Sequence, residues 1–269
     1  IPLVAFWLWN HGQRLYFAGN WTAPEADLKG WILLFFWGFL THVLLDCFTT
    51  YGTQVFAPFS NQRVAWGTVS VVDPLYTLPF LICLLIAARF ARNDARRTVW
   101  NRVGLAWSCL YLALTAVNQS HVHRTVEVAL QGQGQSYRQF LITPTIFNNL
   151  LWNVVVDAGD EFLLAQYSIL DEVPIAFNSV SNGYELLQNM DADETIGVLQ
   201  WFSAGYLNAV RRSDGALQLN DLRFGTFSGR AENADDYIFR FELIEQELGQ
   251  PYGFKRAPGR PPDKKAEEM

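Results

Sequence analysis

Two residues that could bind a metal ion lie one helical turn apart inside an apolar stretch. His42 and Asp46 stand in the run 31–48 (WILLFFWGFLTHVLLDCF), which has the composition of a membrane span. An ionisable side chain near the centre of a span costs roughly 2.5 to 3.5 kcal/mol, so its presence indicates a function or a specific partner. Spacing i, i+4 places both side chains on one helix face, where they could bind one divalent ion, zinc or another. The alternative is a hydrogen-bonded pair that fastens two helices.

A hydrolytic metal site needs at least one ligand beyond these two. Catalytic zinc usually takes three protein ligands and leaves one position for a water whose pKa falls to about 7. Asp73 is the leading candidate, as metal ligand or general base, because it starts the next apolar run. It precedes Pro74, and Asp before Pro is also a common helix N-cap, so capping alone is the alternative. His121 and His123 (HVH) have strand spacing and are interpreted as surface histidines at a membrane boundary.

The segment between these acids carries polar residues suited to a substrate. It reads TTYGTQVFAPFSNQRVAW at 49–66. We expect Thr50, Tyr51 and Arg63 to bind the substrate, with Ser60 and Arg63 orienting it during catalysis. Arg63 could clamp a phosphate or carboxylate through its planar fork of donors. Alternatively, Arg63 is an anchor at the level of the lipid headgroups.

Composition predicts an α-helical membrane part with three to four spans, followed by a small α+β soluble domain. The chain is 50% hydrophobic and 17% charged, and most of the apolar excess lies before residue 120. The predicted spans are 1–9, 31–48, 73–90 and 103–117. The predicted domains are a transmembrane domain at 1–135 with a re-entrant or surface loop at 49–72, an α+β domain at 136–254 and a disordered tail at 255–269. Because the chain opens with IPLVAFWLW and no initiator Met, we expect a fragment.

The later sequence alternates polar and apolar residues as a soluble domain does. Strand composition occurs at 150–156, 161–168 and 237–243, and SDGA at 213–216 is a hairpin turn signal. The segment 191–211 is predicted to be helical, with an acidic first turn. Three cysteines, Cys47, Cys83 and Cys109, fall in apolar runs and form no CxxC pair, which predicts core or lipid-facing thiols.

Charge limits the possible partners and the topology. A net charge of −6 argues against nucleic acid, which needs a basic stripe. The segment 89–102 holds five arginines and one aspartate, so we expect it on the cytoplasmic side. Counting spans then puts 49–72 and the C-terminal domain outside, although the basic tail at 255–265 favours the opposite orientation.

Several motifs resemble one bacterial family. The run THVLLDCFTTYGTQVFAPFSNQRVAWGTVSVVDPLYTLP at 41–79 looks like the inner-membrane family of metal-dependent hydrolases, also called YdjM-like or LexA-binding hydrolases. The resemblance extends through 101–111, 144–156 and 220–225. It implies a multi-pass membrane part and a metal site at His42, Asp46 and Asp73. The upstream P-D-x-D and H-R-G-x-T-H-S motifs of that family are absent from this chain, so half of the site is expected to be missing here.

The sequence therefore predicts a metal-dependent hydrolase of the bacterial inner membrane. Its metal-activated water would attack an ester or phosphoester in a lipid or another small molecule. The alternative is a non-catalytic membrane protein whose buried polar residues lock helices and whose C-terminal domain binds a partner. A small transporter is less well supported, because the spans are few and show no internal repeat. No protein partner can be named from the residues.

Overall fold

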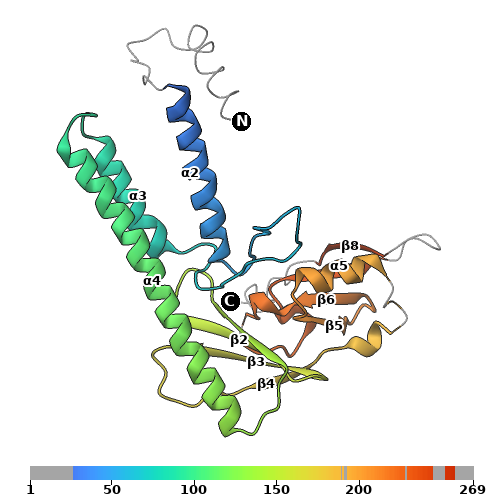
Figure 1. The fold of residues 1–269 in the computed structure, drawn as a ribbon. Helices are drawn as coiled ribbons and strands as arrows, with labels where there is room; N and C mark the ends of the chain where they lie inside the picture. The colour runs from blue at the N-terminus through green and yellow to red at the C-terminus, as the bar shows by residue number, and fades with distance from the viewer. Residues whose placement is uncertain (1–26, 189, 191–192, 228, 245–251, 258–269) are drawn as a thin grey trace, which may run out of the picture. The chain divides into compact units, whose positions relative to one another are not determined.

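The computed structural model describes residues 27–188, 190, 193–227, 229–244 and 252–257 (Figure 1). The chain divides into two compact units, residues 1–66 and 67–269. The predicted span at 1–9 lies outside the described residues. A helical N-terminal part followed by antiparallel sheets confirms the predicted order of helical and α+β regions.

The first unit contains one long apolar helix, α2 (Leu28–Cys47). Its N-cap is Asp27, whose carboxylate accepts a hydrogen bond from the backbone N–H of Gly30 at 2.8 Å. Its 20 residues extend about 30 Å, the thickness of the hydrocarbon core of a bilayer. Its mean hydropathy is 1.6, and it is the one helix in the described part of the chain that is long and apolar enough to cross a membrane. Length and composition thus support one span, where the sequence predicted three to four.

The segment after α2 folds back on the end of that helix. The backbones of Thr53 and Val64 form an isolated antiparallel bridge. The backbone N–H of Trp66 donates to the carbonyl of Cys47 at 2.7 Å, and the Trp66 ring meets Phe48 edge to face at 4.7 Å. Residues 49–66 therefore form a closed loop whose two ends are both fixed at the C-terminal end of α2.

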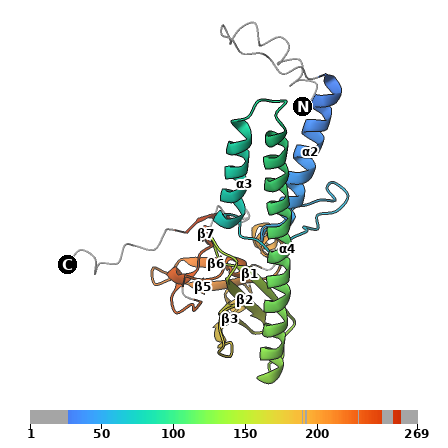
Figure 2. The same ribbon diagram turned by 90° about the vertical axis from the view of Figure 1, so that its left-hand side faces the viewer.

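The second unit opens with two antiparallel helices, α3 (Pro74–Ala88) and α4 (Ala95–Gly132) (Figure 2). Gly104 lets them approach closely, because a Cβ there would lie 3.1 Å from the Cβ of Cys83. The hydroxyls of Tyr76 and Ser108 are hydrogen-bonded at 2.8 Å. The predicted span at 103–117 is thus the middle of one helix of 38 residues, which continues far past its apolar part.

The C-terminal half of α4 covers a first antiparallel sheet. Val122, Val126 and Leu130 share one face of the helix and are fully buried against this sheet. The strand order is β1 (Gln139–Pro144), β2 (Leu151–Asp157), β3 (Glu161–Ser168), β4 (Asn178–Ser181). The strand spacing read from His121 and His123 is wrong, because both lie on α4, where the helical burial of Val122 decides the conformation.

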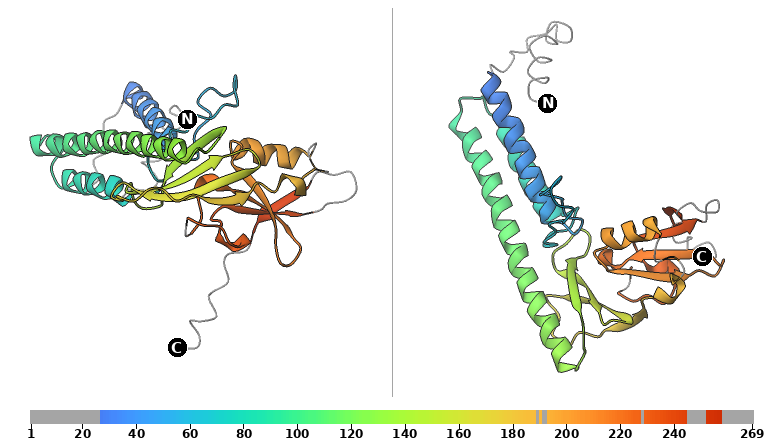
Figure 3. Two further views of the ribbon diagram at one scale, coloured as in Figure 1. Left: turned by 90° about the horizontal axis from the view of Figure 1, so that it is seen from below. Right: turned by 45° about the vertical axis from the view of Figure 1, so that its right-hand side comes forward.

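A second antiparallel sheet completes this unit (Figure 3). Its strands are β5 (Leu207–Arg211), β6 (Leu217–Asp221), β7 (Arg240–Ile244) and β8 (Gly253–Arg256), and helix α5 (Glu194–Phe202) packs on it. Short 3₁₀ turns are η1 (Tyr184–Leu186), η2 (Leu222–Phe224) and η3 (Ala234–Asp236).

Several helix and strand boundaries in this region differ from those predicted from the sequence. The SDGA turn is confirmed, with Arg212 N–H donating to the Ala216 carbonyl at 2.9 Å. The predicted helix 191–211 is too long: Ala204 and Gly205 have φ of 55° and 84°, which ends the helix before β5. The predicted strand 237–243 corresponds to β7, which begins at 240. Residues 255 and 256, predicted to be disordered, lie in β8, and 258–269 fall outside the described residues.

Candidate functional site

His42 and Asp46 face each other on the last two turns of α2. The Nε2 atom of His42 lies 3.4 Å from Oδ2 of Asp46, and the two side chains are 73% and 46% exposed. The distance is longer than the 2.7 to 3.2 Å of a typical N–H···O hydrogen bond. Helical spacing therefore brings the two side chains together, as the sequence predicted. Both side chains remain partly exposed on the helix surface.

This separation fits two ligands of one metal ion. Ligands of a tetrahedral zinc ion, each about 2.0 to 2.2 Å from the metal, stand roughly 3.3 to 3.5 Å apart. The His42–Asp46 distance of 3.4 Å falls in that range without any movement of the helix. An imidazole nitrogen and a carboxylate oxygen are also donors that zinc accepts.

The loop 49–66 brings the predicted substrate-binding residues to the same end of α2. Arg63 Nη1 donates to the backbone carbonyl of Tyr51 at 3.2 Å, so these two residues lie together. The Ser60 hydroxyl accepts from the backbone N–H of Gln62 at 3.1 Å, which is a local turn contact. Thr50 is half-buried, three residues past the end of α2. Trp66 was not predicted to matter, yet its contacts with the helix end are what close the loop.

Asp73, in the second unit, is buried and fully engaged. Its Oδ1 accepts the backbone N–H groups of Leu75 and Tyr76 at 3.0 and 3.3 Å, which makes it the N-cap of α3. Its Oδ2 accepts the hydroxyl of Tyr111 at 2.7 Å, and the residue is 2% exposed. These contacts join α3 to α4. The D-P signal for a cap was readable in the sequence, whereas the Tyr111 contact spans 38 residues and was not.

The described residues contain no cluster of three or more His, Cys, Asp or Glu side chains that could hold a metal. His123 packs on Phe140, with ring centroids 4.6 Å apart, and His121 is exposed on α4. Neither contributes to a second metal site in this part of the chain. Of the predicted metal ligands, the structure brings two together, His42 and Asp46.

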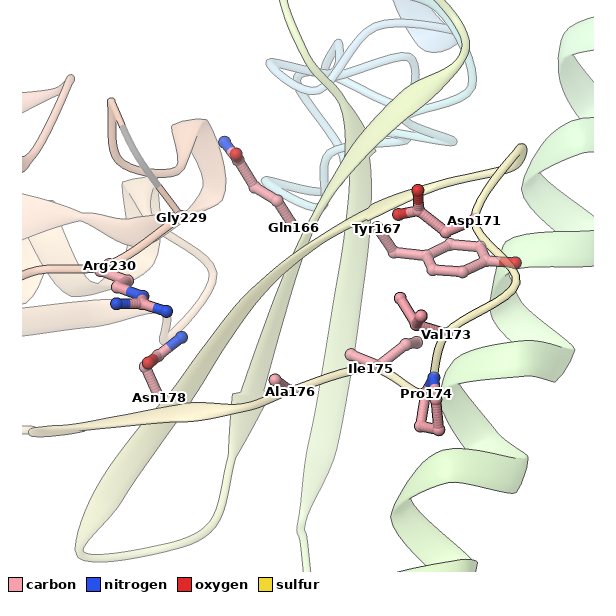
Figure 4. Close-up of a pocket in the computed structure, with 10 residues that line it drawn as sticks. All are labelled: Gln166, Tyr167, Asp171, Val173, Pro174, Ile175, Ala176, Asn178, Gly229 and Arg230. Carbon is pink, nitrogen blue, oxygen red and sulfur yellow. The ribbon is translucent and has the colours of Figure 1, made fainter.

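A small hollow lies between the first sheet and the loop at Gly229 (Figure 4). Its volume is about 220 Å³, and Gln166, Tyr167, Asn178 and Arg230 are among its lining residues. Asp171 is the one carboxylate among the described residues that line it, and this group already accepts the backbone N–H of Ser168 at 3.0 Å. The hollow is smaller than the roughly 300 to 1,000 Å³ of typical ligand pockets and has no second acid for a metal.

The NDLRFG motif at 220–225 forms a buried ion pair. Arg223 Nε and Nη2 donate to the two carboxylate oxygens of Asp221 at 2.9 and 2.6 Å, and the side chains are 4% and 0% exposed. The backbone carbonyl of Arg223 also accepts the Thr143 hydroxyl at 2.9 Å. The motif therefore ties the second sheet to β1 and has no open side for a substrate.

Comparison with known proteins finds one similar family for the N-terminal part of the chain. Residues 1–122 match the family described as YdjM inner membrane protein, which confirms the predicted resemblance for these residues. Together with α2, this match supports a membrane location. The family description names a location and no reaction.

A particular relative adds a second comparison. The "uncharacterized protein YfhP" of Bacillus subtilis (strain 168) is 35% identical over 176 residues, which are 62% of this chain and 47% of the relative. The chain thus spans about half the length of the curated relative that it matches. No solved structure matches the chain.

Proposed function

We propose that this protein is a membrane-bound, metal-dependent hydrolase in which His42 and Asp46 bind a divalent ion, with zinc as the first candidate. The observation that carries the proposal is their 3.4 Å separation, which equals the ligand spacing of a tetrahedral zinc ion. Their place in the last two turns of an apolar helix adds support, because ionisable residues within membrane spans are rare and usually functional. When bound, the ion would activate a water for attack on an ester or phosphoester.

The residues of the loop have separate roles in this proposal. Arg63 would hold the anionic group of the substrate, because its guanidinium donates in a fork that matches a phosphate or carboxylate. The hydrogen bond from Nη1 of Arg63 to the Tyr51 carbonyl holds the guanidinium itself beside Tyr51, near the end of α2. Thr50, Tyr51 and Ser60 would offer hydroxyls for orienting the substrate. A lipid or another amphiphile is the natural substrate class at this position.

Asp73 is the third ligand or general base that the family resemblance implies. Its three hydrogen bonds and its burial support a different role, that of a cap which locks α3 to α4. We therefore assign the metal-binding half of the site to His42 and Asp46. Whether Asp73 is a ligand as well is tested by the metal affinity of Asp73→Asn.

A second candidate function is a non-catalytic membrane protein. The full engagement of Asp73 favours it, because a polar residue that only joins helices needs no ion. In that case the His42–Asp46 contact would serve a partner helix.

Metal content and hydrolysis separate these two functions. We expect the protein expressed from its complete gene to hold about one equivalent of divalent metal after purification in detergent. It should also release product from fluorogenic carboxylic or phosphate esters in a reaction that a chelator stops. Both properties should be lost in His42→Ala and retained in His121→Ala, the matched control on α4. A metal-free protein with no chelator-sensitive hydrolysis would support the non-catalytic function.

We further propose that the α3–α4 hairpin also lies in the bacterial inner membrane, so that the protein is multi-pass. Its outer surface is apolar, with exposed Leu75, Leu78, Leu81, Ile82, Leu85, Val103, Leu105 and Leu110. The 15 residues of α3 extend about 22 Å, which a bilayer accommodates by local thinning. The arginines of 89–102 would remain on the cytoplasmic side. Asn93→Cys should then react with a membrane-impermeant thiol reagent only after cells are opened, and reaction in intact cells would contradict this orientation.

A further inference from the structure

The loop 49–66 carries an apolar tip that no described part of its own unit covers. Val55, Phe56 and Phe59 are 43%, 56% and 94% exposed. Single exposed apolar residues are normal on a protein surface, but three within five residues form a patch. The intervening residues, Ala57 and Pro58, are apolar as well.

The loop also contains no charge over a long stretch. Between Asp46 and Arg63 the sequence has no Asp, Glu, Lys, Arg or His. A charged side chain would oppose entry into a bilayer, whereas this composition permits it. Tyr51 and Trp66, at the two ends of the loop, are of the aromatic types that prefer the membrane–water interface.

The base of the loop is fixed to the membrane helix. Trp66 is hydrogen-bonded and packed against the last turn of α2, and the Thr53–Val64 bridge closes the loop above this base. The residues between 53 and 64 are therefore held at the far end of a short closed loop. They cannot move far from the level at which α2 leaves the bilayer.

The loop extends sideways from the end of the helix. In Figures 1 and 2 the segment after α2 leaves the C-terminal end of the helix laterally, and its outer part rises a short way towards the level of the last helical turns. A tip that rises towards the last turns of a membrane span points towards the lipid. Leu40 and Leu44, near the same end of α2, are exposed apolar residues as well.

We propose that residues 55–59 insert into the lipid headgroup and upper acyl-chain region beside the C-terminal end of α2. The occupant of this apolar surface is the bilayer itself, and electrically neutral lipid suffices because the tip carries no charge. This inference depends on α2 lying in the membrane, and it does not depend on a bound metal.

Fluorescence quenching tests the insertion. An environment-sensitive fluorescent amino acid is incorporated at position 59 of the complete protein, which is then reconstituted in phosphatidylcholine vesicles. The 94% exposed side chain of Phe59 can be replaced without disturbing packing. Matched probes at Leu34, in the middle of α2, and at Asp160, in the exposed β2–β3 turn, provide the lipid and water references. Spin-labelled lipids report contact with the bilayer, and iodide reports contact with water.

The expected result is quenching at position 59 by lipid spin-labelled near the headgroup, with an iodide quenching constant several-fold below that at Asp160. Iodide quenching equal to that at Asp160 would overturn the proposal. Protection from both quenchers would overturn it too, because protein and not lipid would then cover the tip. The Leu34 probe separates the two ideas: lipid quenching there without lipid quenching at 59 rejects the inserted loop but leaves the membrane location and the proposed hydrolase intact.

Discussion

Removal of either member of the His42–Asp46 pair should abolish most of the zinc affinity of the protein. In His42→Ala the imidazole nitrogen is lost, and in Asp46→Asn the shape is kept while the anionic oxygen becomes a neutral amide oxygen. Both donors lie 3.4 Å apart in the same two turns of one helix, so they would chelate a single ion. We therefore expect the two substitutions to have similar effects.

The proposed role of His42 and Asp46 as metal ligands sets a lower limit for the loss of zinc affinity. Changes to residues that only orient a metal ligand typically cost 10- to 100-fold in affinity, so loss of a ligand should cost at least about 100-fold, or about 2.7 kcal/mol. The two changes should not be additive. Once one arm of the chelate is gone, the remaining group binds the ion weakly, and the double variant should lose little more than either single variant.

Zinc titration of the complete protein against a competing fluorescent chelator measures this effect. His121→Ala is the control, because it removes an exposed imidazole from another helix, α4, at a position outside the proposed pair. The same titration of Asp73→Asn determines whether that residue is a ligand, since asparagine retains the capping oxygen. Wild-type affinity in the His42→Ala, Asp46→Asn double variant would refute the pairing argument.

Three further predictions concern the second unit, each measured by thermal unfolding in detergent followed by circular dichroism. Asp73→Ala should destabilise the protein by about 1 to 3 kcal/mol, through a lost cap and an unpaired Tyr111 hydroxyl, and Asp73→Asn by less; equal losses would contradict a capping role. Asp221→Ala should lower the free energy of unfolding by about 3 to 5 kcal/mol, because it leaves the buried Arg223 guanidinium without its partner carboxylate. The double variant Asp221→Leu, Arg223→Met should regain part of that stability, and no gain would argue against the ion-pair explanation. Burial, assisted by Asp157, raises the pKa of Tyr206, so this residue holds its proton more tightly in the folded state; the stability it contributes is complete below its ordinary pKa of about 10 and decreases above it. Tyr206→Phe should flatten that alkaline decrease, and an unchanged pH profile would exclude Tyr206 as its source.

Local signals allowed single features of both units to be predicted. The i, i+4 spacing of His42 and Asp46 alone determines that they meet, because a helix fixes that geometry from neighbouring residues. The D-P dipeptide likewise indicated the start of α3. The SDGA turn needed only Gly215, which adopts a φ of 86°.

Contacts between distant segments were outside the reach of such signals. The apolar run at 103–117 and the polar residues after it form one helix, because its second half finds a sheet to cover with Val122, Val126 and Leu130. Periodicity over a short window could not show that partner. The same reason explains why HVH was read as strand-spaced.

The sequence by itself determined the membrane helix, the matched pair of possible ligands on it and the likeness to an inner-membrane family, since each depends on composition or on spacing within a few residues. Only the tertiary structure decided what Asp73 contacts, where the loop after α2 is fastened and that NDLRFG is a buried ion pair. These depend on backbone and side-chain partners that lie far away along the chain, such as Tyr111 for Asp73 and Thr143 for Arg223. Folding brings such partners together through the burial of whole surfaces, which no local pattern of residues specifies.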